Sequence, residues 1–205
     1  MFRRDRRLVL LAALPVALLL VLRPAAAVEA GPASAFIEKL GNEAIQALTK
    51  PGIDKATREQ AFRRLLNDTF AVKGIGRFVL GRHWRGTDEQ QQRRYLAAFE
   101  NLIVATYAAR FEQYDGQSFT VGAERADGED GRIVDSQIAG REGKPVKLQW
   151  RLRQSPEGLK IVDIMVEGVS MAITQRSEFA AVMQQKNGSI DGLIEELEAK
   201  VKRMR

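Results

Sequence analysis

The sequence predicts an α+β fold in which several helices pack on a curved antiparallel sheet of about four strands. From about residue 32 to residue 114, apolar side chains recur every three or four residues, as in amphipathic helices. Between residues 119 and 170 the period changes to two, as in strands with one buried face, and a helical spacing then returns. Helices and strands in separate blocks favour α+β over a doubly wound parallel sheet.

Residues 1–27 are predicted to be a cleaved signal peptide, followed by a single domain over residues 28–205. Arginines precede an apolar run over residues 8–22, and Ala25-Ala26-Ala27 supplies small residues before the cleavage point. Cleavage after Ala30 is the second choice. The chain has no Cys, and export without disulfides fits a bacterial periplasm, so the predicted localisation is periplasmic.

The charge of the predicted mature chain argues against nucleic-acid binding. The whole sequence has a net charge of +6, but residues 1–27 contain five Arg and one Asp, which leaves 27 basic and 25 acidic side chains. These charges are mixed in sign, without the dense basic patch and interleaved aromatic residues of a nucleic-acid site. We therefore expect no nucleic-acid partner.

The N-terminal half is predicted to form four helices from the spacing of its apolar side chains. Thr57 with Gln60, and Thr87 with Gln90, have the spacing of capping boxes and would start the second and fourth helices. Gly74 and Gly76 weaken the short third helix, and the fourth is the longest and is rich in aromatic residues. The predicted helices are residues 32–49, 57–70, 72–80 and 87–114.

The C-terminal half is predicted to begin with four strands and to end with two helices. Breaks rich in Gly and Asp separate the first three strands, and Ser155-Pro156-Glu157-Gly158 supplies a turn between the third and fourth. Asn187-Gly188 separates the two helices. The predicted strands are residues 119–124, 132–139, 146–154 and 159–170, and the helices are residues 171–185 and 189 onward.

The hairpin over residues 146–170 has one strongly apolar face. Its first strand alternates strictly, with Leu148, Trp150 and Leu152 apolar and the residues between them polar. Its return strand is almost entirely apolar. Something apolar must cover this face, and the functional question is whether protein side chains alone cover it.

No set of residues stands out for metal binding or catalysis. His83 is the only histidine and lies at a predicted helix end, and there is no Cys, so a His/Cys metal cluster or a catalytic triad with His has almost nothing to be built from. Gly74-Ile75-Gly76 lacks the preceding strand and the following Lys of a phosphate-binding loop. No catalytic residue, metal or cofactor is predicted.

Several segments, in the same order over roughly residues 36–200, resemble one family. The most specific is Ile161-Val162-Asp163-Ile164-Met165-Val166-Glu167-Gly168-Val169-Ser170, followed by Gln175-Arg176-Ser177-Glu178-Phe179. Others are Phe78-Val79-Leu80-Gly81-Arg82-His83-Trp84-Arg85, Phe99-Glu100-Asn101-Leu102, Thr106-Tyr107 and Tyr114-Asp115-Gly116-Gln117. Together they resemble the MlaC family, the "toluene tolerance" periplasmic lipid carriers.

The resemblance implies a lipid carrier and not an enzyme. Members of this family shuttle glycerophospholipids between an outer-membrane lipoprotein complex and an inner-membrane ABC transporter complex, and so maintain the lipid asymmetry of the outer membrane. The expected partners are therefore phospholipid and these two Mla complexes. A sister group associated with hopanoid lipids is the alternative within the superfamily.

The carrier hypothesis places acyl chains in an apolar cavity between the hairpin and the long aromatic helix. A diacyl lipid has about 30 methylenes, and each costs ~0.8 kcal/mol to expose to water, so the lipid needs an escort. The predicted lining residues lie on these elements and in the segments that resemble the family: Phe78, Trp84, Phe99, Leu102, Ile103, Tyr107, Phe111, Leu148, Trp150, Val166, Val169 and Met171.

Two other classes of function remain open from the residues alone. Tyr107, Tyr114 and Asp163 would serve acid–base chemistry if they converged in the cavity. A structural interaction protein would instead fill its apolar faces with its own side chains. For the carrier, a modest and partly electrostatic docking surface is expected, with candidate charges at Arg82, Arg85, Lys147, Arg151 and Arg153.

Overall fold

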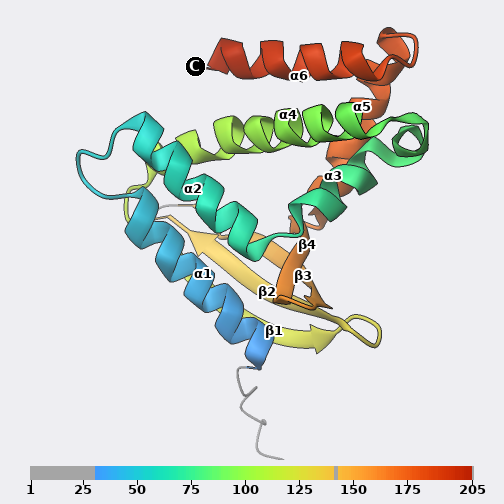
Figure 1. Cartoon of the computed structure of the whole chain (residues 1–205). Helices are drawn as coiled ribbons and strands as arrows, with labels where there is room; N and C mark the ends of the chain where they lie inside the picture. Colours follow the sequence, from blue (N-terminus) through green and yellow to red (C-terminus); the bar gives the residue numbers. More distant parts are fainter. Residues whose placement is uncertain (1–30, 141–142, 205) are drawn as a thin grey trace, which may run out of the picture.

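The computed structural model describes residues 31–140 and 143–204, so the predicted signal peptide and both predicted cleavage points lie outside the described residues. Six α-helices lie over and beside an antiparallel sheet (Figure 1). In chain order the elements are α1 (Pro32–Leu48), α2 (Lys55–Thr69), α3 (Val72–Leu80), the 3₁₀ helix η1 (Gly81–Gly86), α4 (Glu89–Ala108), η2 (Ala109–Gln113), β1 (Ser118–Ala126), β2 (Gly131–Ala139), β3 (Val146–Ser155), β4 (Gly158–Val166), β5 (Val169–Ser170), α5 (Met171–Gln185) and α6 (Ile190–Met204). The α+β prediction is confirmed.

The sheet has five strands in the order β1-β2-β3-β4-β5, whereas about four were predicted. The extra strand comes from the predicted run over residues 159–170, which is broken at Glu167 and Gly168. Both residues have positive φ, 49° and 81°, as in the two-residue turns that join antiparallel strands. Glu rarely adopts a positive φ, so the residue type at position 167 gave no sign of a two-residue turn. The run of apolar residues was therefore predicted as one strand.

Aspartates start the second and fourth helices, and the two predicted capping boxes are wrong. The Asp54 carboxylate accepts the Thr57 backbone N–H at 2.9 Å, so Thr57 lies inside the first turn of α2. Asp88 forms a capping box with Gln91 at the start of α4, while the hydroxyl of Thr87 donates to the backbone of the preceding 3₁₀ helix. A carboxylate one or three residues away competes successfully for the exposed N–H groups.

Helical winding continues to Gln113, close to the predicted end at Tyr114, but the last part is 3₁₀ helix. The α-helix proper ends at Ala108, and η2 follows directly. A tighter final stretch of this kind is common where a helix runs out of partners for its last carbonyl groups.

The buried apolar residues form two separate clusters. The helical core lies between α3, η1, α4, α5 and α6, and includes Tyr95, Phe99, Leu102, Phe179 and Leu193. The sheet core lies between α1 and the strands, and consists of Ala33, Ile37, Leu40, Val134, Leu152 and Ile161. Figure 1 shows α4 and α6 stacked above the sheet, with α2 crossing between the two levels.

Contacts at the sheet's edges fasten the first two helices to it. Glu124 of β1 accepts hydrogen bonds from the backbone N–H and the hydroxyl of Ser34, at 2.8 and 3.1 Å, and so caps α1, which has no capping side chain of its own. Just after α2, the Ala71 N–H donates to the Ile161 carbonyl of β4 at 2.9 Å. Among the described helices, none is long and apolar enough to span a bilayer.

Candidate functional site

One face of the sheet, which we call the inner face, carries the apolar side chains of the strands. The register places Trp150 between Val134 and Ile164, and places Leu148 opposite Val166. Residues that are directly opposite on neighbouring strands point to the same side. The predicted apolar face of the hairpin is therefore a real surface, and it continues onto β2.

Eight large apolar side chains around the sheet core are only partly buried, and we call this set the apolar lining. They come from α1, α2 and the segment just after it, β1, β3 and β4, so parts of the chain far apart in sequence contribute to one surface. Because α4 packs mainly against α6, the helical core does not close over them. The apolar lining consists of Phe36, Leu65, Phe70, Phe119, Val121, Trp150, Leu159 and Ile164.

Trp150 is the largest member of the lining, and its polar atom is satisfied. Its indole N–H donates to the Ser136 hydroxyl of β2 at 2.8 Å. Its ring meets the Phe119 ring edge-on, with 6.3 Å between the centroids. The hydrogen bond and the ring contact fix the indole, so the face around it presents hydrocarbon without an unpaired donor.

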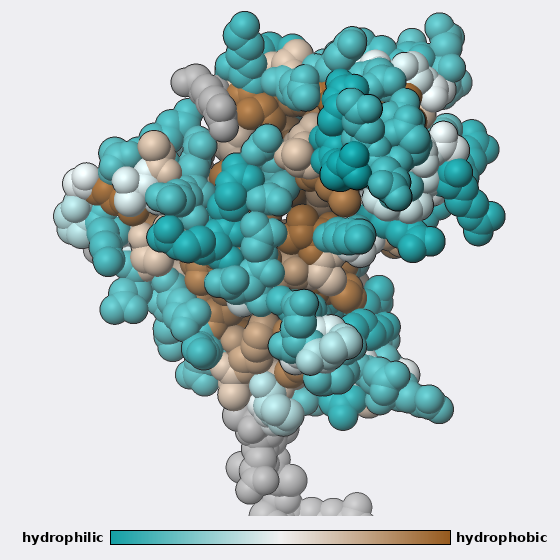
Figure 2. All heavy atoms as spheres, viewed as in Figure 1, coloured by the Kyte–Doolittle hydropathy of each residue, from teal (hydrophilic) through white to brown (hydrophobic). Residues whose placement is uncertain are grey.

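Apolar atoms also reach the surface between the helices. Figure 2 shows hydrophobic atoms in a strip between polar side chains, from the level of α4 down to the sheet. Large apolar surfaces left partly open on a protein mark binding sites more often than single exposed residues do. The strip and the lining together indicate a site for an apolar ligand.

The structure brings three of the four predicted residues in the sheet, Leu148, Trp150 and Val166, together on the inner face. It places three predicted helical residues elsewhere, because Trp84, Phe99 and Leu102 are buried in the helical core. Phe99 and Leu102 are each 2% exposed, and their part in ligand binding stays a prediction.

The other predicted lining residues are spread over several environments. Ile103 packs against the helical core, and Phe111 lies beside the Phe62 ring with 6.1 Å between centroids. Tyr107 is half-buried beneath the Arg110 guanidinium, and Met171 is half-buried at the start of α5. Phe78 and Val169 are exposed, at 43% and 55%. Their part in ligand binding stays a prediction.

Sequence reasoning did not select most of the apolar lining. Leu65 and Phe70 follow the helical stripe of α2, and Phe119 follows the period of β1, so a signal was present in each case. The spacing of apolar residues does not reveal that the apolar faces of α2 and β1 border the same core. Gly41 contributes to this closeness, because a Cβ at that position would clash with the Phe119 ring.

Two of the three groups considered for acid–base chemistry, Asp163 and Tyr114, make hydrogen bonds that hold local structure. Asp163, which is 7% exposed, accepts the Ala172 backbone N–H at 3.0 Å and the Ser170 hydroxyl at 2.6 Å, and so holds the start of α5. The Tyr114 hydroxyl donates to the Gln117 carbonyl at 3.1 Å. Within the described residues, no group of three or more His, Cys, Asp or Glu side chains is placed to hold a metal.

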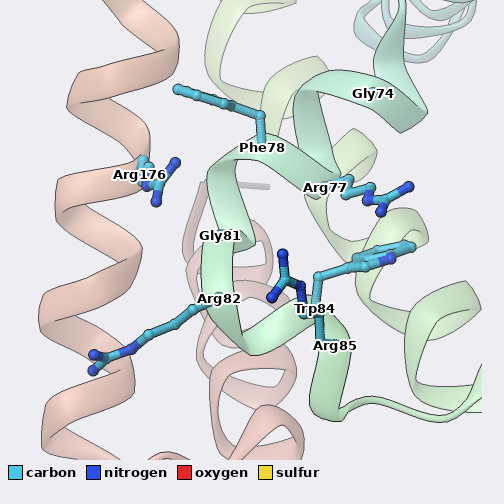
Figure 3. Close-up of a pocket in the computed structure, with 8 residues that line it drawn as sticks. All are labelled: Gly74, Arg77, Phe78, Gly81, Arg82, Trp84, Arg85 and Arg176. Atoms are coloured by element: carbon cyan, nitrogen blue, oxygen red, sulfur yellow. The ribbon is translucent and has the colours of Figure 1, made fainter.

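A second surface feature is a groove of about 520 Å³ beside α3 and α5, far richer in charge than the lining. Four arginines, two aromatic residues and two glycines line it, and none of these residues is acidic. In Figure 3, Phe78, Arg82 and Arg176 lie on the side of α5, and Arg77 and Trp84 lie on the other side of the α3–η1 bend. The lining residues are Gly74, Arg77, Phe78, Gly81, Arg82, Trp84, Arg85 and Arg176.

Four of the five charges predicted to dock partners fall into two groups, and the fifth, Lys147, is an exposed residue of β3. Arg151 and Arg153 lie 3.1 and 2.7 Å from the Asp127 carboxylate, and Arg153, above all, lowers the pKa of that carboxyl. Arg82 and Arg85, by contrast, belong to the groove described above.

Comparison with known proteins shows which family the chain belongs to. Residues 38–199 match the family model described as MlaC protein. The chain belongs to the MlaC family. As an MlaC-family protein it is 23% identical over 136 residues to "Toluene tolerance protein ttg2D" of Pseudomonas putida, a match that covers 66% of this chain and 63%, less than two thirds, of that protein.

A solved structure of another protein has the same fold. It is the phospholipid-binding protein from Ralstonia solanacearum in complex with a phospholipid, 23% identical, with a TM-score of 0.77 over 85% of this chain and 99% of that one. At this level of identity the likeness establishes the fold.

Proposed function

We propose that this MlaC-family protein is a phospholipid carrier that holds acyl chains against the apolar lining. The observation that carries the proposal is the lining itself, with eight large apolar side chains from five parts of the chain left partly exposed around one core. Family membership and a structural neighbour that binds a phospholipid support the same ligand class. Acyl chains are the apolar ligand that a cell supplies in quantity.

The energetics require a site of bilayer-like apolarity. Each acyl methylene gains about 0.8 kcal/mol on leaving water, so a dry, hydrocarbon-lined surface can compensate for loss of the membrane. Binding much tighter than a bilayer would prevent release. The lining has this character, because its one indole N–H is satisfied within the protein.

The headgroup would remain at the mouth of the site, in contact with solvent. Such a carrier would work in the periplasm and exchange lipid with an outer-membrane lipoprotein complex and an inner-membrane ABC transporter complex. This cycle maintains the asymmetry of the outer membrane. These are the partners that membership of the MlaC family favours.

Mass spectrometry of the lipids that co-purify with the mature protein tests the proposal. We expect glycerophospholipid bound to the purified protein, and uptake of phospholipid from vesicles by the delipidated protein. Recovery of hopanoids instead would move the protein to the alternative ligand class. A protein that neither carries lipid nor takes it up would return the fold to a purely structural role.

A further inference from the structure

The groove beside α3 and α5 gathers most of the described arginines that have no carboxylate partner. Nine of the other arginines in residues 31–140 and 143–204 lie within 4.0 Å of a carboxylate. Six arginines do not, and four of these six line the groove: Arg77, Arg82, Arg85 and Arg176. Unpaired guanidinium groups gathered in one place repel one another, so they indicate an anionic partner.

Two exposed apolar side chains lie beside these arginines, and a third lies just before α5. Phe78 is 43% exposed, and the Arg176 guanidinium lies over its ring, 5.0 Å from the centroid. Ile173 is 57% exposed and precedes Arg176 by three residues, so both lie on one face of α5. Val169, at 55%, lies in β5 just before α5. These three are among the six large apolar side chains described as exposed.

Arg176 connects the two kinds of residue. Besides covering Phe78, it lies against Gly81, where a Cβ would approach its guanidinium to 3.1 Å, in a backbone position with φ of +62° that favours glycine. A second groove, of about 940 Å³, continues on the other side of Arg82 and Arg176 along α5. The guanidinium groups of Arg82 and Arg176 therefore lie between two grooves, and neither pairs with a carboxylate in the described part of the chain.

This combination fits the surface of a phospholipid bilayer. Arginine forks hydrogen-bond to phosphodiester oxygens in pairs, and an anionic leaflet attracts clustered cations. Aromatic and aliphatic side chains beside such cations enter the boundary between headgroups and acyl chains. An acidic protein segment would match the charge, but Phe78, Val169 and Ile173 are the three most exposed of the large apolar side chains described as exposed. A partner with a hydrocarbon interior can bury them, which favours the bilayer.

We propose that the arginine patch, defined as Arg77, Arg82, Arg85 and Arg176 with Phe78, Val169 and Ile173, docks the protein on an anionic phospholipid surface. Phosphodiester groups occupy the groove, and the apolar side chains insert at the level of the headgroups. This inference goes beyond the proposed function, because a carrier that exchanged lipid only through protein complexes would need no contact with a bilayer.

Vesicle flotation with the full mature chain tests the proposal. The probes are vesicles of phosphatidylcholine alone and of phosphatidylcholine mixed with phosphatidylglycerol, at low and at physiological salt. We expect binding to the mixed vesicles that weakens as salt rises. Reversal of two charges, in Arg82→Glu/Arg176→Glu, should weaken it about tenfold or more. Arg77→Glu/Arg85→Glu makes the same charge change without altering the contact between Arg176 and Phe78. It should weaken binding to the mixed vesicles as well, because the proposal places all four arginines in the docking surface.

A matched control carries the same change of charge elsewhere. Lys39→Glu/Arg64→Glu alters exposed residues of α1 and α2, which lie away from the patch (Figure 1), and should leave binding nearly unchanged. Phe78→Ser/Ile173→Ser should weaken binding while its dependence on salt remains, because only the inserted apolar area is lost. Melting temperatures show that each variant is folded.

Several results would overturn the proposal. Equal binding to both kinds of vesicle, no binding at all, or equal losses in the patch and control variants would each do so. Patch variants that bind vesicles normally but fail to exchange lipid with a protein complex would point to an acidic protein partner instead. The amount of co-purified phospholipid is measured in parallel. Its absence from the wild-type protein would contradict the proposed function without bearing on the docking surface.

Discussion

Val166 and Leu102 differ in exposure, although both are apolar and both were predicted to line the cavity. Val166 is half-buried opposite Leu148 on the inner face, whereas Leu102 is 2% exposed in the helical core. Enlarging a side chain in a packed core costs about 1–3 kcal/mol, whereas enlarging one beside open space costs little. The same kind of substitution should therefore act differently at the two sites.

Val166→Phe is expected to reduce bound phospholipid while the melting temperature of the delipidated protein is nearly kept. Leu102→Trp is expected to lower the free energy of unfolding by about 1–3 kcal/mol. The stability of both variants is measured by thermal or denaturant unfolding of delipidated samples, because bound lipid itself raises apparent stability. Bound phospholipid is measured by mass spectrometry of the purified protein. Equal losses of stability in the two variants would show that the inner face is as tightly filled as the helical core.

Asp127 gives the stability a dependence on pH. Arg153 first, then Arg151 and Arg125, lower the pKa of its carboxyl from the ordinary value of 3.8, and desolvation opposes them only in part. A lowered pKa in the folded state means that the charged carboxylate stabilises the fold above the unfolded pKa. This contribution is lost as the pH falls through the folded value.

Asp127→Asn should therefore reduce stability at neutral pH, and the difference from wild type should shrink below about pH 4. Urea unfolding at a series of pH values measures this. Glu129→Gln, at an exposed position of the same turn, serves as the control. A difference that persisted undiminished in acid would show that the charge of Asp127 is not its source.

At the scale of elements, α1 depends on a strand that lies far away in the sequence for its N-terminal cap. Glu124, 90 residues after Ser34, supplies the acceptor that α1 itself lacks. Its negative charge also lies at the positive end of the helix dipole. Because α1 covers the sheet core and contributes Phe36 to the apolar lining, this one carboxylate positions part of the lining.

Glu124→Ala is expected to lower the free energy of unfolding by about 0.5–2 kcal/mol, the usual cost of losing a cap. Hydrogen exchange should rise in the first turn of α1 and not in α6. The exposed residue Glu38, on the same helix, is the control, since Glu38→Ala removes the same charge without a cap. Unchanged exchange in α1 would show that the cap does not hold this helix.

At the scale of the whole molecule, we expect the two cores to respond differently to the proposed ligand. The helical core is closed, with Leu193 of α6 fully buried in it, whereas the sheet core is bordered by the partly exposed lining. A ligand on the lining adds to stability with the logarithm of its concentration relative to its dissociation constant, by about 2.7 kcal/mol at a hundredfold excess. The helical core contributes the same free energy with or without lipid.

Delipidation should therefore lower the melting temperature of the wild type and raise hydrogen exchange in β3 and β4 more than in α6. Leu193→Ala should cost about 2–5 kcal/mol in both the lipid-bound and the delipidated protein, because it opens a cavity in the closed core. Calorimetry of the four samples measures both effects. A loss for Leu193→Ala that depended on lipid would mean that the two cores are not independent.

The sequence by itself determined the order of the elements, the apolar face of the hairpin and the turn at residues 155–158. These follow from local periods and from turn residues, which depend only on neighbours along the chain. The family likewise followed from ordered motifs, and the match over residues 38–199 confirmed it. The helix caps were harder to predict, because each helix start offers two candidate capping residues within three positions. The caps are Asp54 and Asp88, where Thr57 and Thr87 were predicted.

Only the tertiary structure decided which partner each apolar stripe meets. A helical stripe shows that a helix buries one face, but not against what, so Phe99 and Leu102 were expected beside the sheet and lie instead against α5 and α6. The same holds for the groove, where Arg82 of η1 and Arg176 of α5 are brought to the same side of the α3–η1 bend. Packing between distant segments leaves no periodic trace in the sequence, because each segment satisfies its own period whatever its partner is.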